Sequence, residues 1–132
     1  MYFLKHWLPV FLWFIFIFYL SSIPNLKSGF EEDFILRKFA HFFEYFILSA
    51  LLFNAILNTA QKRPNFRSAA FLSFLFSVLY AASDEFHQTF VVGRHGDIKD
   101  VFLDSLGVIS GIFAFYKFKL ISRAKDEQEQ NK

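Results

Sequence analysis

Apolar side chains fill four long stretches of the chain, at residues 1–20, 39–57, 68–82 and 101–118, and short polar segments separate them. A helix needs roughly 20 such residues to cross a bilayer. The third stretch covers only about 23 Å at 1.5 Å per residue, so we expect its helix to continue to Gln88. This continuation would hold Asp84 and Glu85 at or just inside the membrane boundary. The pattern predicts an all-α integral membrane bundle of four transmembrane helices.

The first stretch begins with Lys5 and carries no charge after His6, which is also how a cleaved signal peptide can begin. Its apolar residues are bulky and aromatic, and the segment Leu20-Ser21-Ser22-Ile23-Pro24 lacks a small-x-small cleavage site. We therefore expect the stretch to remain in the protein as a membrane anchor.

Charged residues are distributed unevenly between the two ends of the predicted helices. Basic residues in short loops stay cytoplasmic, and with both termini inside, nine of the 14 Lys and Arg residues lie on that side. Nine of the 12 acidic residues gather at the other, outer end. We therefore expect an N-in, C-in membrane protein, with a four-helix domain at 1–123 and a charged, disordered cytoplasmic tail at 124–132.

Two function classes are disfavoured by composition. The basic residues lie in short turns typical of topology signals, so no nucleic-acid partner is expected. The chain contains no cysteine, which excludes disulfides, a thiolate nucleophile and a cysteine-based zinc site.

A first polar cluster lies near the start of the second stretch. Lys38, His41 and Tyr45 are spaced i, i+3 and i+7, which places them on one stripe of a helix, and Glu44 borders that stripe. A Lys beside a His and a Glu could bind an anion next to an acid or base. Alternatively, Lys38 extends to the headgroups and His41 only pairs with Glu44.

A second cluster follows the third stretch. Asp84 and Glu85 can share a helix face with Gln88, and neighbouring carboxylates repel each other unless a cation lies between them. That cation could be Arg94, Lys38, a proton or a metal ion.

His87 points elsewhere by spacing, so we expect a surface histidine in the outer loop. Gly93 and Gly96 mark a turn around Arg94 and His95. Arg94 is suited to bidentate binding of phosphate or carboxylate, or else lies at the headgroup boundary.

Three aspartates lead into the fourth stretch. Asp97 and Asp100 could cap its helix and oppose the N-terminal dipole. Asp104 lies a full turn into the apolar stretch, where a cap does not explain it. Gly107 and Gly111 form a small-xxx-small face that permits close helix packing.

Taken in order, these motifs resemble the VanZ-like family of small bacterial membrane proteins. The resemblance covers nearly the whole chain and rests on Leu20-Ser21-Ser22-Ile23-Pro24, Lys38-x-x-His41-x-x-Glu44-Tyr45, Asp84-Glu85-x-x-Gln88, Gly93-Arg94-x-x-Asp97-x-x-Asp100 and Gly107-x-x-x-Gly111. It implies a cell-envelope function, such as low-level resistance to glycopeptide antibiotics like teicoplanin. Asp104 departs from the pattern, which often has Asn there, so Asp104 is either protonated or an added metal-binding carboxylate.

An enzyme acting on a lipid headgroup or a lipid-linked envelope precursor is the first hypothesis. Its catalytic residues would be His41, Glu44, Asp84 and Glu85, and its substrate-binding residues would be Lys38, Tyr45, Gln88, Arg94, Asp100 and Asp104. A divalent cation such as Mg²⁺, or Mn²⁺, would suit oxygen ligands drawn from Asp84, Glu85, Asp100 and Asp104. The sequence contains neither a nucleophile motif nor an HExxH metal motif, and this absence counts against the enzyme hypothesis.

Three other functions remain open. The same anion-binding residues would serve a non-catalytic module that binds an envelope lipid or a drug. A transporter component is less favoured, because four spans leave little room for alternating access. The polar residues could also form a structural network that only holds the helices together.

Overall fold

The computed structural model describes residues 2–24, 33–59, 65–94 and 96–130, and most of them lie in four α-helices. The helices are α1 (Tyr2–Ser21), α2 (Asp33–Thr59), α3 (Phe66–Gln88) and α4 (Ile98–Gln130). The predicted all-α class is confirmed, and all four helices are long and apolar enough to be membrane spans. The turn residue His95 and some of the charges counted for the orientation, namely Glu31, Glu32, Lys62 and Arg63, lie outside the described residues.

The helix boundaries follow local chemistry. Asn65 caps α3, because its side-chain oxygen accepts a hydrogen bond of 2.7 Å from the backbone N–H of Ser68. As the short third stretch predicted, α3 runs on to Gln88. In the turn that follows, Gly93 has a φ of 78°, a left-handed conformation that only glycine adopts without strain.

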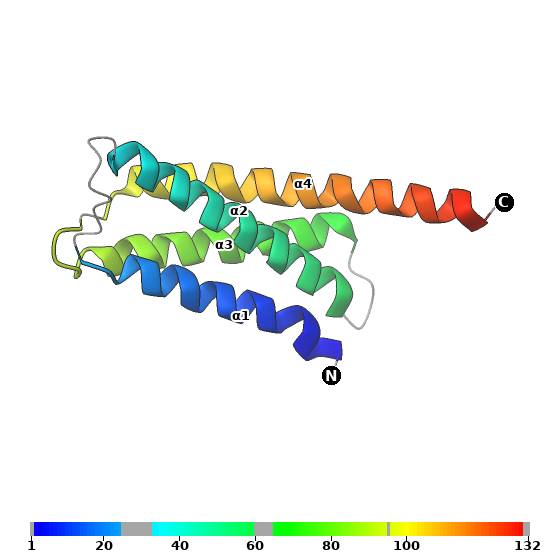
Figure 1. Ribbon diagram of the computed structural model, residues 1–132, viewed down its shortest axis with the longest axis horizontal. Helices are drawn as coiled ribbons and strands as arrows, with labels where there is room; N and C mark the ends of the chain where they lie inside the picture. The colour runs from blue at the N-terminus through cyan, green and yellow to red at the C-terminus, as the bar shows by residue number, and fades with distance from the viewer. Residues whose placement is uncertain (1, 25–32, 60–64, 95, 131–132) are drawn as a thin grey trace.

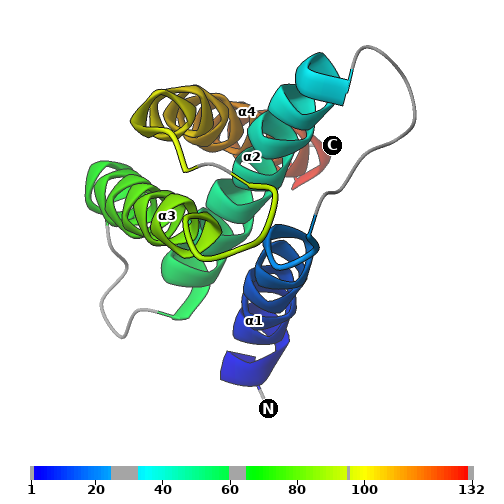
Figure 2. The same ribbon diagram turned by 90° about the vertical axis from the view of Figure 1, so that its left-hand side faces the viewer.

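Helix α2 is the central element of the bundle. It packs against each of the other three helices, and α3 also packs along α4. Helix α1 contacts α2 and, over a few residues, α3, as the end-on view in Figure 2 shows. Both chain termini lie at one end of the bundle in Figure 1, so the ends of α1 and α3 meet the starts of α2 and α4 at the opposite end.

The outside of the bundle is apolar. Large exposed side chains occur on every helix, for example Ile15, Phe43, Phe71 and Phe102. Soluble monomers rarely expose contiguous apolar surface on this scale. The exposed side chains therefore suit hydrocarbon rather than water, which agrees with four spans.

The predicted small-residue face on α4 lies directly against α2. A Cβ atom at Gly107 would overlap the carbonyl oxygen of Phe42, and one at Gly111 would overlap the carbonyl oxygen of Phe46. The hydroxyl of Ser49 lies 3.0 Å from the carbonyl oxygen of Val108 and bridges the two helices. Glycine at these two positions thus allows the α2 and α4 backbones to approach closely.

The expectation of a disordered tail is wrong for residues 124–130. Helix α4 continues through them and extends beyond the other helices (Figure 1). The tail consists mainly of strong helix formers, and the spacing of Arg123 to Glu127 and of Lys125 to Glu129 places opposite charges one turn apart.

Replacement of Gly111 by Ala tests the close contact. Alanine normally favours a helix by about 1 kcal/mol over glycine, but here its methyl group meets backbone and should cost about 1–3 kcal/mol. We expect a lower midpoint of thermal unfolding in detergent. Ala114→Val, which adds methyl groups on an exposed position of α4, should change stability by less than about 0.5 kcal/mol. Equal or higher stability of Gly111→Ala would contradict the close contact.

Candidate functional site

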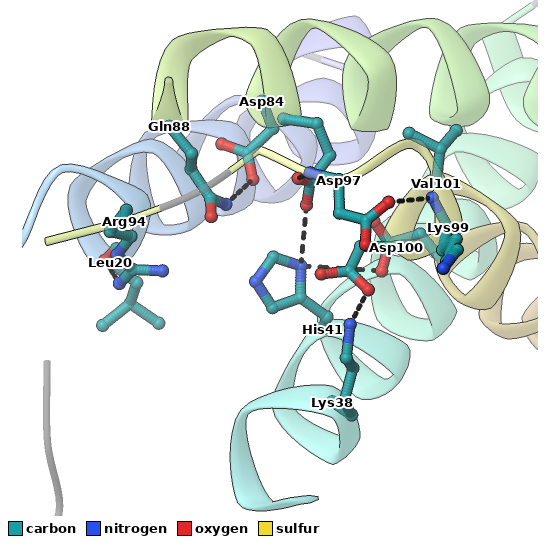
Figure 3. A network of polar contacts seen from close by, with 12 residues as sticks. Leu20, Lys38, His41, Asp84, Gln88, Arg94, Asp97, Lys99, Asp100 and Val101 are labelled. Atoms are coloured by element: carbon teal, nitrogen blue, oxygen red, sulfur yellow. Dashed lines mark hydrogen bonds and ion pairs between the residues drawn. The ribbon is translucent and has the colours of Figure 1, made fainter. Parts of the chain in front are cut away.

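Three buried ionisable side chains from three helices meet at the end of the bundle opposite the termini. His41 comes from α2, Glu85 from α3 and Asp104 from α4. The Nδ1 atom of His41 lies 3.6 Å from Asp104 Oδ1 and 3.9 Å from Glu85 Oε1. Asp104 is fully buried, Glu85 is 5% exposed and the His41 side chain is 13% exposed. Figure 3 shows the His41 ring at the centre of this network.

The helix contacts explain why these residues meet. Asp104 lies one turn before Gly107, and Gly107 packs on Phe42, the residue that follows His41. The close approach of α4 to α2 therefore places Asp104 beside His41. Glu85 is positioned by the loop between α3 and α4, because its Oε2 accepts a hydrogen bond of 2.8 Å from the backbone N–H of Asp97.

An ion pair between Lys38 and Asp100 lies one turn farther toward the end of the bundle. It joins the first turns of α2 and α4, and both side chains are largely buried, at 27% and 20% exposed. Figure 3 shows the Lys38 side chain reaching Asp100. The alternative in which Lys38 extends to the headgroups therefore does not describe this structure.

Asp84 and Glu85 have different partners, although the spacing allowed both to share Gln88. Gln88 Nε2 donates a hydrogen bond of 3.0 Å to Asp84 Oδ2, whereas Glu85 faces His41. Consecutive residues on a helix are about 100° apart around its axis. Asp84 thus lies on the side of α3 that faces α1, and Glu85 lies on the side that faces α4.

A small cavity of about 80 Å³ lies between the end of α1, the first turns of α2 and the end of α3. Its lining contains both basic and acidic side chains. The lining residues are Leu20, Ser21, Arg37, Ala40, His41, Glu44, Asp84 and Arg94. Four of the predicted site residues, His41, Glu44, Asp84 and Arg94, therefore line the same cavity. Arg37 is a lining residue that the sequence analysis did not single out. Its position four residues before His41 was the available signal.

Arg94 connects the loop after α3 to the end of α1. Its Nη2 donates a hydrogen bond of 2.7 Å to the carbonyl oxygen of Leu20, and its Nε donates one of 3.2 Å to that of Ile23. Burial lowers the pKa of the Arg94 guanidinium, and the positive charge of Arg37 lowers it further, while Asp84 and Glu44 oppose this shift. Two guanidinium groups thus lie close enough to repel each other beside the cavity.

The sequence matches the profile of the VanZ/LLP1 family over residues 6–121, a range that contains α2, α3 and most of α1 and α4. The chain belongs to the VanZ/LLP1 family. No curated protein and no solved structure matches the chain. The family match and the four candidate spans together establish a VanZ-like multi-pass membrane protein.

One alternative and one expectation for this VanZ-like bundle do not describe the structure. His41 does not simply pair with Glu44, because its Nδ1 faces Asp104 and Glu85. His87 is not a loop residue. It belongs to α3, where its Nε2 lies 3.1 Å from the hydroxyl oxygen of Ser22 and its ring packs on Phe18.

The remaining predicted site residues have separate surroundings. Tyr45 is fully buried, and its hydroxyl has no hydrogen-bond partner among the described residues. Asp97 acts as the predicted cap, since its Oδ1 accepts a hydrogen bond of 2.9 Å from the backbone N–H of Lys99. Asp100 is committed to Lys38. Only Glu85 and Asp104, among the four predicted metal ligands, lie together beside His41.

Lys38→Met tests the ion pair at the end of the bundle. It leaves Asp100 without this cation, and we expect a loss of about 1.5–3 kcal/mol in the free energy of unfolding in detergent. Addition of Asp100→Asn should recover part of the loss, because the unpaired charge is then removed. Lys99→Met, which removes an exposed cation at the same end, should have little effect. An equal effect of both lysine substitutions would show that the pair contributes no specific stability.

Proposed function

We propose that this VanZ-family protein binds the anionic headgroup of a membrane lipid, or of a lipid-linked envelope precursor, in the cavity between α1, α2 and α3. The proposal rests on one observation: Arg37, Arg94 and His41 line the same cavity. A phosphate between two guanidinium groups would relieve their repulsion and accept charge-assisted hydrogen bonds. The cavity lies at the helix ends, where a headgroup can reach it.

The acidic residues narrow the ligand class. Glu44 and Asp84 also line the cavity, so a bare anion would meet like charge there. A phosphate that carries hydroxyl or amine donors would match both signs, because the donors can bond to the carboxylates. Phosphatidylglycerol has this chemistry and serves as the test ligand. A sugar phosphate linked to a lipid would share it.

The cellular setting is part of the same proposal. With nine of 14 basic residues on the cytoplasmic side, the termini lie inside and the cavity faces the outer leaflet of the bacterial cytoplasmic membrane. The VanZ-like resemblance adds the expectation of an envelope role linked to glycopeptide resistance, including teicoplanin. An envelope precursor bound at the outer leaflet would connect the orientation of the cavity with the envelope role.

A structural network, a binding module and an enzyme make different demands on these polar residues. A purely structural network is disfavoured because buried polar atoms of Tyr45, Glu85 and Asp104 have no hydrogen-bond partner among the described residues. A binding module needs only the cavity. An enzyme would also use His41 as an acid or base, with Glu85 and Asp104 controlling its charge.

Native mass spectrometry of the detergent-purified protein with phosphatidylglycerol tests the binding site. Arg37→Gln removes one guanidinium from the cavity wall, and we expect about tenfold weaker binding, or about 1.4 kcal/mol. Arg37 is the better target because Arg94 also holds backbone carbonyls. Lys99→Gln, an exposed cation at the same end but outside the cavity, is the matched control.

Equal lipid occupancy in wild type and Arg37→Gln would refute the cavity as the headgroup site. Equal losses in Arg37→Gln and Lys99→Gln would indicate unspecific attraction to basic residues. The same spectra separate the binder from the enzyme. A product mass formed by wild type and not by His41→Gln, with binding preserved, would establish chemistry on the headgroup.

Single-cysteine labelling tests the orientation, since the chain contains no cysteine of its own. Val92→Cys places a thiol on the exposed loop after α3, and Lys125→Cys places one near the end of α4. In intact cells, we expect a membrane-impermeant maleimide to label Val92→Cys. Lys125→Cys should react only after permeabilisation. The reverse pattern would place the cavity at the cytoplasmic face.

A further inference from the structure

The cluster of His41, Glu85 and Asp104 has hydrogen-bonding capacity that the described protein atoms do not use. Both carboxylate oxygens of Asp104, Glu85 Oε1 and His41 Nδ1 are buried and have no hydrogen-bond partner among the described residues. Asp104 is fully buried and faces His41 at 3.6 Å, beyond hydrogen-bond length. Unpaired buried carboxylate oxygens are costly, so they indicate a partner of opposite charge.

The charged residues around the cluster indicate how much positive charge the cluster lacks. Lys38 is matched by Asp100, and the cavity beside the cluster contains two guanidinium groups and two carboxylates. Within the described residues, this leaves the carboxyl groups of Glu85 and Asp104, which carry two negative charges when both are ionised, beside one histidine. A protonated His41 would balance only one of them. A divalent cation with neutral His41 would balance both.

The donor geometry suits a metal ion. One atom from each of the three residues lies within 4.8 Å of the other two. Ligands about 2.1 Å from a tetrahedral metal are separated by about 3.4 Å, and His41 Nδ1 is 3.6 Å and 3.9 Å from the two acids. Small side-chain movements would therefore complete the site. A set of one imidazole nitrogen and two carboxylate oxygens suits zinc or manganese better than magnesium, which prefers oxygen alone.

We propose that His41, Glu85 and Asp104 bind one divalent transition-metal ion, zinc or manganese, between α2, α3 and α4. The site differs from the all-carboxylate site expected from the sequence, because Asp84 and Asp100 have other partners. His41 also lines the headgroup cavity, so the ion would lie next to the proposed lipid site. The metal proposal deepens the proposed function but requires no lipid.

Metal titration of the full-length protein in lipid-free detergent tests this site. The protein is purified with a histidine-free tag, stripped with a chelator and titrated with Zn²⁺ by calorimetry. Co²⁺ then serves as a visible-absorption probe of a nitrogen- and oxygen-ligated site. We expect one equivalent of Zn²⁺ to bind and to raise the midpoint of thermal unfolding.

Asp104→Asn and Glu85→Gln should each weaken Zn²⁺ binding by more than about tenfold, since even loss of a side chain that only orients a ligand commonly costs 10–100-fold. Asp84→Asn is the matched control, because Asp84 is a buried acid on the same helix as Glu85 but lies outside the triad. Its Zn²⁺ affinity should fall much less than that of Asp104→Asn, because the Asp84 carboxylate would act on the ion only through its charge and not as a ligand. Asp104→Glu keeps the carboxylate and should bind more tightly than Asp104→Asn.

Circular dichroism and size-exclusion chromatography identify any variant that fails to fold, and His41→Gln then replaces it as the test. The absence of stoichiometric Zn²⁺ binding by folded wild type would overturn the proposal. Equal losses in Asp84→Asn and Asp104→Asn would overturn it as well. Because no lipid is present, a failure here is distinct from a failure of headgroup binding, which Arg37→Gln reports.

Discussion

The close contact between α2 and α4 determines the geometry of the whole polar end. Gly107 and Gly111 let the α4 backbone meet the carbonyl groups of α2, where any side chain would separate the helices. That approach sets the distance between His41 and Asp104, which no contact within a single helix could do. The cost of glycine in a helix is offset by the packing that its absent side chain allows.

Charge compensation explains how the remaining polar residues are arranged. Ionisable groups within membrane-spanning helices are expensive unless each has a partner. At the end of the bundle, Lys38 meets Asp100, and toward α1 the side chain of Asp84 meets Gln88. Farther in, the triad of His41, Glu85 and Asp104 places two carboxyl groups beside one histidine. The divalent cation proposed above would balance both carboxylates.

The cavity proposed to bind a headgroup and the triad of His41, Glu85 and Asp104 are neighbours with different chemistry. The cavity presents two guanidinium groups and two carboxylates near the ends of α1 and α3, which suits a phosphate with attached donors. The triad lies on the α4 side of His41 and suits a metal ion. Since His41 belongs to both, a cation in the triad would affect the charge that a headgroup meets.

The sequence by itself determined the four membrane helices, because runs of apolar residues can satisfy their backbone groups in lipid only as helices. Spacing also placed Lys38, His41 and Tyr45 on one helical stripe and identified Gly107 and Gly111 as a packing face. Only the tertiary structure decided the partners. His41 faces Asp104 and Glu85 instead of Glu44, Gln88 bonds to Asp84, and His87 packs on α1. Spacing defines the direction of a side chain around its own helix, but the neighbour in that direction depends on how the helices pack together.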